Sequence, residues 1–349
     1  MVSKLRVCIS AALWLVLMGG IAPAYFSHWL HRDQGLAEDK RYFVVASGES
    51  LVSVARRLHD QEMLRWPTIW RLYGQYLNPG LIKVGEYQFL ERETPVSMLH
   101  RLHSGAVITY SVTLVEGPTF NDWLELLALQ PKLNITLAGK SQEQQLKLLD
   151  LGLEHPEGWF YPDTYQFVAG DSDLALLRRA HHLMRQVLER EWADRALDLP
   201  YATPYEALIM ASIIERETGL ASERKDVAGV FVRRLRVGMR LQTDPTIIYG
   251  LGSDFTGNLT RQHLRTPGPY NTYTNFGLTP TPIAMPSGAA IHAPMHPADG
   301  TSLYFVAKGD GSHQFSDTLQ EHNRAVQQYQ RQRRADYRSF PAPAVEQQP

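Results

Sequence analysis

The chain has very little cysteine, because Cys8 is the only one among its 349 residues. No disulfide can form within the chain, so its stability must come from the packing of apolar side chains. Apolar residues make up 44% of the sequence and charged residues 20%, a composition typical of globular proteins with a buried core. A cysteine nucleophile is also excluded, because Cys8 lies in an apolar segment near the N-terminus.

The chain also lacks an excess of charge of either sign. Lys and Arg number 35 and Asp and Glu number 36, which gives a formal net charge of -1. Nucleic-acid-binding proteins usually carry a basic excess, so no nucleic-acid partner is predicted. The sequence contains no H-E-x-x-H, G-x-S-x-G or P-loop motif. Its histidines are scattered, and Pro294 is expected to prevent His292 and His296 from pairing on a helix. We therefore predict no metal and no cofactor.

The N-terminal segment predicts a membrane anchor. Lys4 and Arg6 precede an uncharged run over residues 7–26, which is long enough to cross a lipid bilayer as a helix. The basic residues favour a cytoplasmic N-terminus. We predict a single-pass anchor over residues 1–27 in the inner (plasma) membrane, with the rest of the chain in the periplasm. The alternative is a cleaved signal peptide, since residues 22–24 have the small-x-small pattern of a cleavage site.

Residues 41–105 predict a small module of strand, helix, helix and strand. The strands are expected at 42–45 and 84–89, and the first helix is expected to begin after Ser47 or Ser50. This order resembles the LysM-type glycan-binding module, and the segments VASGESL at 45–51 and VARRL at 54–58 carry that resemblance. The alternative is a small spacer that binds no ligand.

Residues 106–335 predict a mixed α/β domain, and residues 336–349 a disordered tail rich in proline. Periodic apolar residues indicate helices near 174–192, 205–218 and 222–237. Residues 241–302 are rich in Pro, Gly, Thr and Asn and are expected to form loops, where functional sites often lie. The predicted fold class is therefore α+β, with an anchor, a LysM-like module and a larger mixed domain.

Carboxyl groups are the remaining candidates for catalysis. Residues 208–214 are almost wholly apolar, so this helix is predicted to be buried, and Glu215 and Glu217 stand at its end. Burial against apolar side chains raises the pKa of a carboxyl group, which lets it donate a proton near neutral pH. A helix end that simply becomes polar again is the alternative. Periodicity by itself does not distinguish Glu215 from Glu217.

Several short segments follow one another in an order that points to one family. They are EGWFYPDTY at 157–165, ASIIERET at 211–218, ASER at 221–224, MRLQTDPT at 239–246, YNTY at 270–273 and LYFV at 303–306. Through these motifs the chain resembles the endolytic murein transglycosylase (YceG-like) family over roughly residues 40–330.

The resemblance implies an enzyme that cleaves peptidoglycan glycan strands without water. The bond cut would be the β-1,4 bond between N-acetylmuramic acid and N-acetylglucosamine, leaving a 1,6-anhydro-muramyl end. Glu215 matches the family's catalytic carboxyl, which would protonate the glycosidic oxygen and then take the proton of the sugar's 6-hydroxyl. Because that hydroxyl is already held beside the reacting carbon, one carboxyl can suffice where ordinary glycosidases need two.

Further motif residues are expected to hold the glycan. Amides and hydroxyls can bind its acetamido and hydroxyl groups, tyrosine rings can pack on the sugars, and a carboxylate can steady the developing positive charge or orient Glu215. These predicted substrate-binding residues are Gln242, Thr243, Asp244, Tyr249, Asn271, Tyr273, Glu223 and Tyr161. For each of them a role in the core or in a turn stays open.

Peptidoglycan is the expected partner, together with cell-wall synthases of the penicillin-binding class, beside which the enzyme would end the elongation of nascent strands. Two alternatives stay open. One is a peptidoglycan-binding anchor protein without catalytic activity. The other is a hydrolytic muramidase, which would leave reducing sugars in place of anhydro ends.

Overall fold

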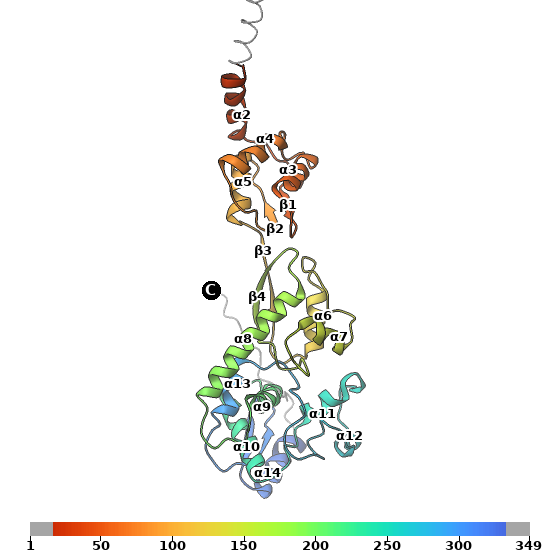
Figure 1. The fold of residues 1–349 in the computed structure, drawn as a ribbon. Helices are drawn as coiled ribbons and strands as arrows, with labels where there is room; N and C mark the ends of the chain where they lie inside the picture. The colour runs from red at the N-terminus through yellow and green to blue at the C-terminus, as the bar shows by residue number, and fades with distance from the viewer. Residues whose placement is uncertain (1–16, 333–349) are drawn as a thin grey trace, which may run out of the picture. The chain divides into compact units, whose positions relative to one another are not determined.

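The structure is a computed structural model that describes residues 17–332. The chain folds into two compact units. Among the described residues, unit 1 contains the chain up to Ser111 with two short later segments, Lys132–Asn134 and Gln166–Asp171, and unit 2 contains the remainder. Helices combine with three two-stranded sheets of order β1-β2, β3-β4 and β5-β6. Figure 1 shows the course of the chain and labels strands β1 to β4. The predicted α+β class is confirmed at this level.

Unit 1 contains the strand–helix–helix–strand order expected from the sequence. Its strands β1 and β2 pair in antiparallel register, with Tyr42 opposite Gln88 and Val45 opposite Gly85. Ser50 begins the first helix of the module, because its side chain accepts a hydrogen bond from the Ser53 amide. The elements are η1 (Leu17–Ile21), α2 (Ala22–Leu30), η2 (Glu38–Lys40), β1 (Tyr42–Val45), α3 (Leu51–Asp60), α4 (Pro67–Leu72), η3 (Tyr73–Leu77), β2 (Gly85–Gln88) and α5 (Pro95–Ser104). The resemblance to a LysM module stays a prediction.

Strand β3 (Thr109–Leu114) follows, and the remaining elements lie mainly in unit 2. They are α6 (Phe120–Ala128), α7 (Gln142–Leu149), β4 (Asp163–Val168), α8 (Asp173–Ala193), α9 (Pro204–Glu217), η4 (Ala221–Glu223), α10 (Arg224–Arg236), α11 (Asp244–Leu251), η5 (Gly252–Asp254), α12 (Arg261–Arg265), α13 (Gly288–Met295), β5 (Tyr304–Ala307), β6 (His313–Ser316), α14 (Leu319–Val326) and η6 (Gln327–Arg331).

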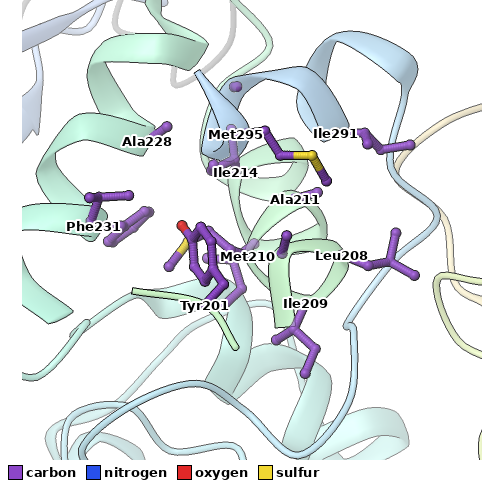
Figure 2. Packing of buried hydrophobic residues seen from close by; sticks show 14 of the residues in the cluster. Tyr201, Leu208, Ile209, Met210, Ala211, Ile214, Ala228, Phe231, Ile291 and Met295 are labelled. Carbon is purple, nitrogen blue, oxygen red and sulfur yellow. The ribbon is translucent and has the colours of Figure 1, made fainter. Parts of the chain in front are cut away.

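Helix α9 lies at the centre of the core of unit 2. Thr203 begins it by accepting a hydrogen bond from the Glu206 amide, and Pro204 occupies its first turn, where a missing N–H costs nothing. Every residue from Ala207 to Glu215 is buried, so the helix has no solvent face over this stretch. Figure 2 shows its side chains between residues of α10 and α13. The buried helix predicted from the sequence is confirmed.

The prediction of loops over residues 241–302 is wrong in part, because α11, α12 and α13 lie in this range. Helix α13 even contains Pro294. Proline removes one backbone hydrogen bond, but the turn continues past it, since the His296 amide still donates to the His292 carbonyl at 3.0 Å. Burial of Ile291, Pro294 and Met295 stabilises this interrupted helix.

Within residues 17–332, no helix combines the length and the apolar character that crossing a bilayer requires. The first part of the predicted anchor, up to residue 16, lies outside the described residues, and so does the predicted tail over 336–349.

Candidate active site

Glu215 lies near the end of α9, where three helices of unit 2 meet. Its side chain is buried, and the residue is 8% exposed. One carboxylate oxygen accepts a hydrogen bond from Nη2 of Arg224, at the start of α10, at 3.1 Å. The other oxygen accepts from the amide of Ser287 at 2.9 Å and from its hydroxyl. Ser287 caps the N-terminus of α13, so the carboxylate also lies at the positive end of that helix dipole.

These contacts differ from the apolar environment that the sequence suggested for Glu215. Helix α9 does bury the side chain, but a guanidinium and a serine surround the carboxylate itself. Arg224 and Ser287 are distant from each other in the sequence, and only the packing of α9, α10 and α13 brings them together. Sequence reasoning found neither as a partner of Glu215.

Glu217, two residues after Glu215 and the last residue of α9, lines a cavity. This cavity has a volume of about 720 Å³ and is lined by Glu217, Arg216 and Arg234 together with residues of α11, β5 and α14. The Glu217 carboxylate accepts a hydrogen bond from the Thr243 hydroxyl. Burial strips water from the carboxylate and raises its pKa to about 7, although the bond from Thr243 opposes the shift. Glu217 can therefore carry a proton near neutral pH.

Glu157 is a third carboxyl group, for which the sequence predicted no role of its own. It is 3% exposed, and burial raises its pKa to about 8. Hydrogen bonds from the Phe120 amide at 3.0 Å and the Tyr249 hydroxyl at 3.2 Å lower the pKa only in part. Glu157 lines a second cavity of about 530 Å³. The signal for Glu157 in the sequence was its place as the first residue of the EGWFYPDTY segment at 157–165.

The two cavities are neighbours, because Arg216, Pro245 and Ile248 line both of them. Arg216 is exposed, and its Nη1 donates to the Gly117 carbonyl at 3.1 Å. Glu217 lines the larger cavity and Glu157 lines the smaller one. This candidate active site presents Glu217 and Glu157, which can carry a proton near neutral pH as general acid catalysis requires. Glu215 lines neither cavity and precedes the shared residue Arg216 in the sequence.

Four of the predicted substrate-binding residues line these cavities. Gln242, Asp244 and Tyr273 line the larger one, and Tyr249 lines the smaller. The Tyr273 hydroxyl donates to the Asp244 carboxylate at 2.6 Å. Gln242 has a φ of 51°, a left-handed conformation that is uncommon for residues other than glycine and occurs preferentially at functional sites.

The other four predicted substrate-binding residues line neither cavity. Thr243 is buried, and its hydroxyl donates a hydrogen bond to the Glu217 carboxylate. The Asn271 amide nitrogen donates to the carbonyls of His263 at 3.0 Å and Thr266 at 2.8 Å, which organises the 263–275 turn. Glu223 accepts hydrogen bonds from the backbone and ring of His313. Tyr161 places its hydroxyl against Gly288, where an added Cβ would come within 2.6 Å.

Residues 17–332 contain one group of side chains with the composition and spacing of a metal site, formed by Glu191, His292 and His296. It lines neither cavity.

An α+β fold with protonatable carboxyls beside neighbouring cavities defines an enzyme of the acid/base class. More particularly, the chain belongs to the YceG-like family, whose match extends over residues 43–328. An endolytic murein transglycosylase of Bacillus subtilis is 29% identical over 303 residues, covering 82% of this chain and 83% of the relative. One from Streptococcus pneumoniae is 25% identical and covers 92% of this chain and 64% of the relative. A crystal structure of a yceG-like protein from Listeria monocytogenes matches with a TM-score of 0.51 at 28% identity, covering 81% of this chain and 98% of that one.

Proposed function

We propose that this chain is a lytic transglycosylase that cleaves peptidoglycan glycan strands. Relatives that bear the name endolytic murein transglycosylase support a lytic transglycosylase as the enzyme class. The bond cut is the β-1,4 bond between N-acetylmuramic acid and N-acetylglucosamine, and the product end is a 1,6-anhydro-muramyl sugar. The observation that carries the proposal is the acidic end of the buried helix α9, which lies beside two neighbouring cavities.

Glu215 is the proposed acid/base. In its acid form it protonates the glycosidic oxygen, and the bond to the muramyl carbon breaks. The sugar's own 6-hydroxyl then attacks that carbon and gives its proton to the Glu215 carboxylate, so no water is consumed. Arg224 and Ser287 hold the carboxyl group in one orientation, which favours the intramolecular step because the reacting groups need not be ordered first.

The cavities supply the binding surface for the strand. Gln242 and Tyr273 offer hydrogen bonds to acetamido and hydroxyl groups from the larger cavity, and the ring of Tyr249 offers an apolar face in the smaller one. The exposed Asp244 carboxylate is placed to stabilise the positive charge that develops on the sugar ring. At neutral pH Glu157 is mostly protonated and Glu217 partly protonated, which limits repulsion between these two groups and the carboxylates of stem peptides.

The cellular context is part of the same proposal. An anchor over residues 1–27, with the lipid bilayer contacted through 7–26, holds the chain in the inner membrane, and the catalytic domain lies in the periplasm. There it cuts nascent strands internally, beside cell-wall synthases, and so ends their elongation. The LysM-like module at 41–105 would bind the glycan near the cut. The uncharged N-terminal run and the family membership support these points.

The test is product analysis with intact sacculi and three variants, Glu215→Gln, Glu217→Gln and Glu157→Gln. Glu125→Gln, an exposed residue on α6, is the matched control. Loss of the acid/base should lower the release of anhydro-muropeptides by about 10²–10⁴-fold in Glu215→Gln and leave the control unchanged. Mass spectrometry distinguishes anhydro ends from reducing ends.

Each contrary result has a defined meaning. Full activity in Glu215→Gln with loss in Glu217→Gln or Glu157→Gln would transfer the acid/base role to that residue. Reducing ends from the wild type would identify a hydrolytic muramidase. Binding of sacculi without any cleavage would identify an anchor protein.

A further inference from the structure

Three potential metal ligands converge where helices α8 and α13 end. Glu191 lies in the last turn of α8, His292 lies in α13, and His296 is the C-cap of α13. One ligand atom from each residue lies within 4.8 Å of the others. Nδ1 of His292 is 2.7 Å from the Glu191 carboxylate, and the two imidazole rings stack with centroids 4.2 Å apart.

The sequence argument against this pair of histidines fails because α13 continues through Pro294. Residues four apart on a helix lie on the same face, and the hydrogen bond from the His296 amide to the His292 carbonyl preserves this geometry. Both rings therefore project toward α8. Neither the composition nor the linear pattern reveals Glu191, which lies about a hundred residues earlier in the chain.

Hydrogen bonds around the cluster hold it in place. The Ala196 amide, just after α8, donates to the Met295 carbonyl at 2.9 Å, which joins the two helix ends through the backbone. Arg190 donates to one oxygen of Glu191 at 3.1 Å and leaves the other oxygen to the histidines. Such outer contacts orient metal ligands and are a regular part of metal sites.

One nitrogen of the cluster lacks a hydrogen-bond partner. Nε2 of His296 is buried and bonds to no group within the described part of the chain, whereas buried polar atoms are normally satisfied. The nearest acidic oxygen belongs to Asp194, at 4.0 Å, beyond hydrogen-bond distance. Asp194 is highly exposed, so its side chain is free to rotate toward the cluster.

We propose that Glu191, His292 and His296 form a binding site for a divalent transition-metal ion of the zinc type. Two imidazoles and one carboxylate are a ligand set that Zn²⁺ accepts, and Asp194 or water completes the coordination. Ligand atoms around a tetrahedral zinc ion lie about 3.3 Å apart, so the widest separation in the present group must shorten by up to about 1.5 Å. The side chains involved are partly exposed and can move this far.

The ion would fasten α8 to α13. The opposite end of α13 presents Ser287 to Glu215, so the site stabilises the helix that orients the candidate catalytic carboxyl. Metal binding itself does not depend on the proposed function, because the cluster lines neither cavity.

The experiment uses the full chain in detergent, with any affinity tag removed. Zn²⁺ affinity is measured by competition with a chromogenic chelator, and Co²⁺ is added as a spectroscopic probe of coordination. The wild type should bind one ion tightly, show the visible absorption of Co²⁺ in a low-symmetry site, and unfold at higher temperature with Zn²⁺. His292→Ala should weaken binding about 100-fold or more and lose the Zn²⁺-dependent rise in Tm.

His182→Ala is the matched control, since His182 is an exposed histidine on α8 outside the cluster, and it should bind like the wild type. Glu191→Gln keeps the size and polarity of the side chain but removes its charge, and it should also weaken binding. It serves as the second variant if His292→Ala does not fold. Equal Zn²⁺ affinity in the wild type and the folded cluster variants, or no binding by the wild type, would overturn the proposal.

Discussion

At the scale of single residues, three buried or half-buried carboxyls near one site differ in their partners. Glu215 is paired with the guanidinium of Arg224. Glu157 and Glu217 receive hydrogen bonds from neutral groups, and burial raises the pKa of each. An ion pair and a neutral hydrogen bond satisfy a carboxyl differently, because only the cation balances a full negative charge in a medium of low dielectric constant. Unit 2 therefore contains one carboxyl group beside a cation and two carboxyl groups that burial lets carry a proton near neutral pH.

Glu157 predicts a pH-dependent stability. Its pKa is about 8 in the folded chain against 4.5 ordinarily, so the folded state binds the proton more tightly. The resulting stabilisation is complete below pH 4.5 and is lost as the pH rises through about 8. Glu157→Gln removes this dependence. The free energy of unfolding of Glu157→Gln minus that of the wild type should therefore rise by up to about 4 kcal/mol between pH 5 and pH 8.

Chemical denaturation of both proteins across this pH range measures the effect. Glu125→Gln on the surface of α6 is the control and should follow the wild type at every pH. Parallel curves for Glu157→Gln and the wild type would mean that Glu157 titrates normally in the folded chain.

At the scale of elements, the turn that carries Glu157 depends on a glycine. Gly158 has a φ of +78°, and a Cβ on it would come within 2.5 Å of Pro282. The loop of 279–286 can therefore approach the 157–165 segment only because residue 158 has no side chain. This contact helps to position Glu157 beside the smaller cavity.

Gly158→Ala should destabilise the chain through both its backbone and its packing. The left-handed backbone costs an alanine about 1–2 kcal/mol, and displacing Pro282 should add about 1–3 kcal/mol. Gly139→Ala isolates the first effect, because Gly139 has a φ of +71° and open space around it. Thermal and urea unfolding of the two variants should differ. An equal loss of stability in both variants would show that displacing Pro282 costs no free energy.

At the scale of the whole molecule, the two units have separate cores. Leu58 and Trp70 belong to the core of unit 1, and Leu208 and Phe231 to that of unit 2. Apolar burial acts through direct contact, so a cavity in one core should loosen mainly the unit that contains it.

Leu58→Ala tests this separation, since Leu58 is fully buried. It should destabilise unit 1 by about 2–5 kcal/mol. Hydrogen exchange read by mass spectrometry should speed up in peptides covering β1, α3 and β2, while α9 keeps its protection. Leu208→Ala is the reciprocal variant, in which α9 should lose protection. Faster exchange of α9 in Leu58→Ala would show that the two units unfold together.

Local patterns predicted the elements whose signals lie within a few residues. Helix α9 was predictable from its apolar run, and α3 from Ser50, because both capping and helical burial depend on near neighbours. Helix α13 was not, since its stability comes from packing of Ile291 and Met295 against distant residues, which outweighs the effect of Pro294.

The sequence by itself determined the family, the α+β class and the place of Glu215 and Glu217 at the end of a buried helix, because these follow from local motifs and apolar spacing. Tertiary structure decided which atoms meet. It paired Glu215 with Arg224 and Ser287, placed Glu157 beside a cavity, and brought Glu191 to the histidines of α13. The reason is that contacts across long separations depend on how helices pack, and no local pattern encodes that packing.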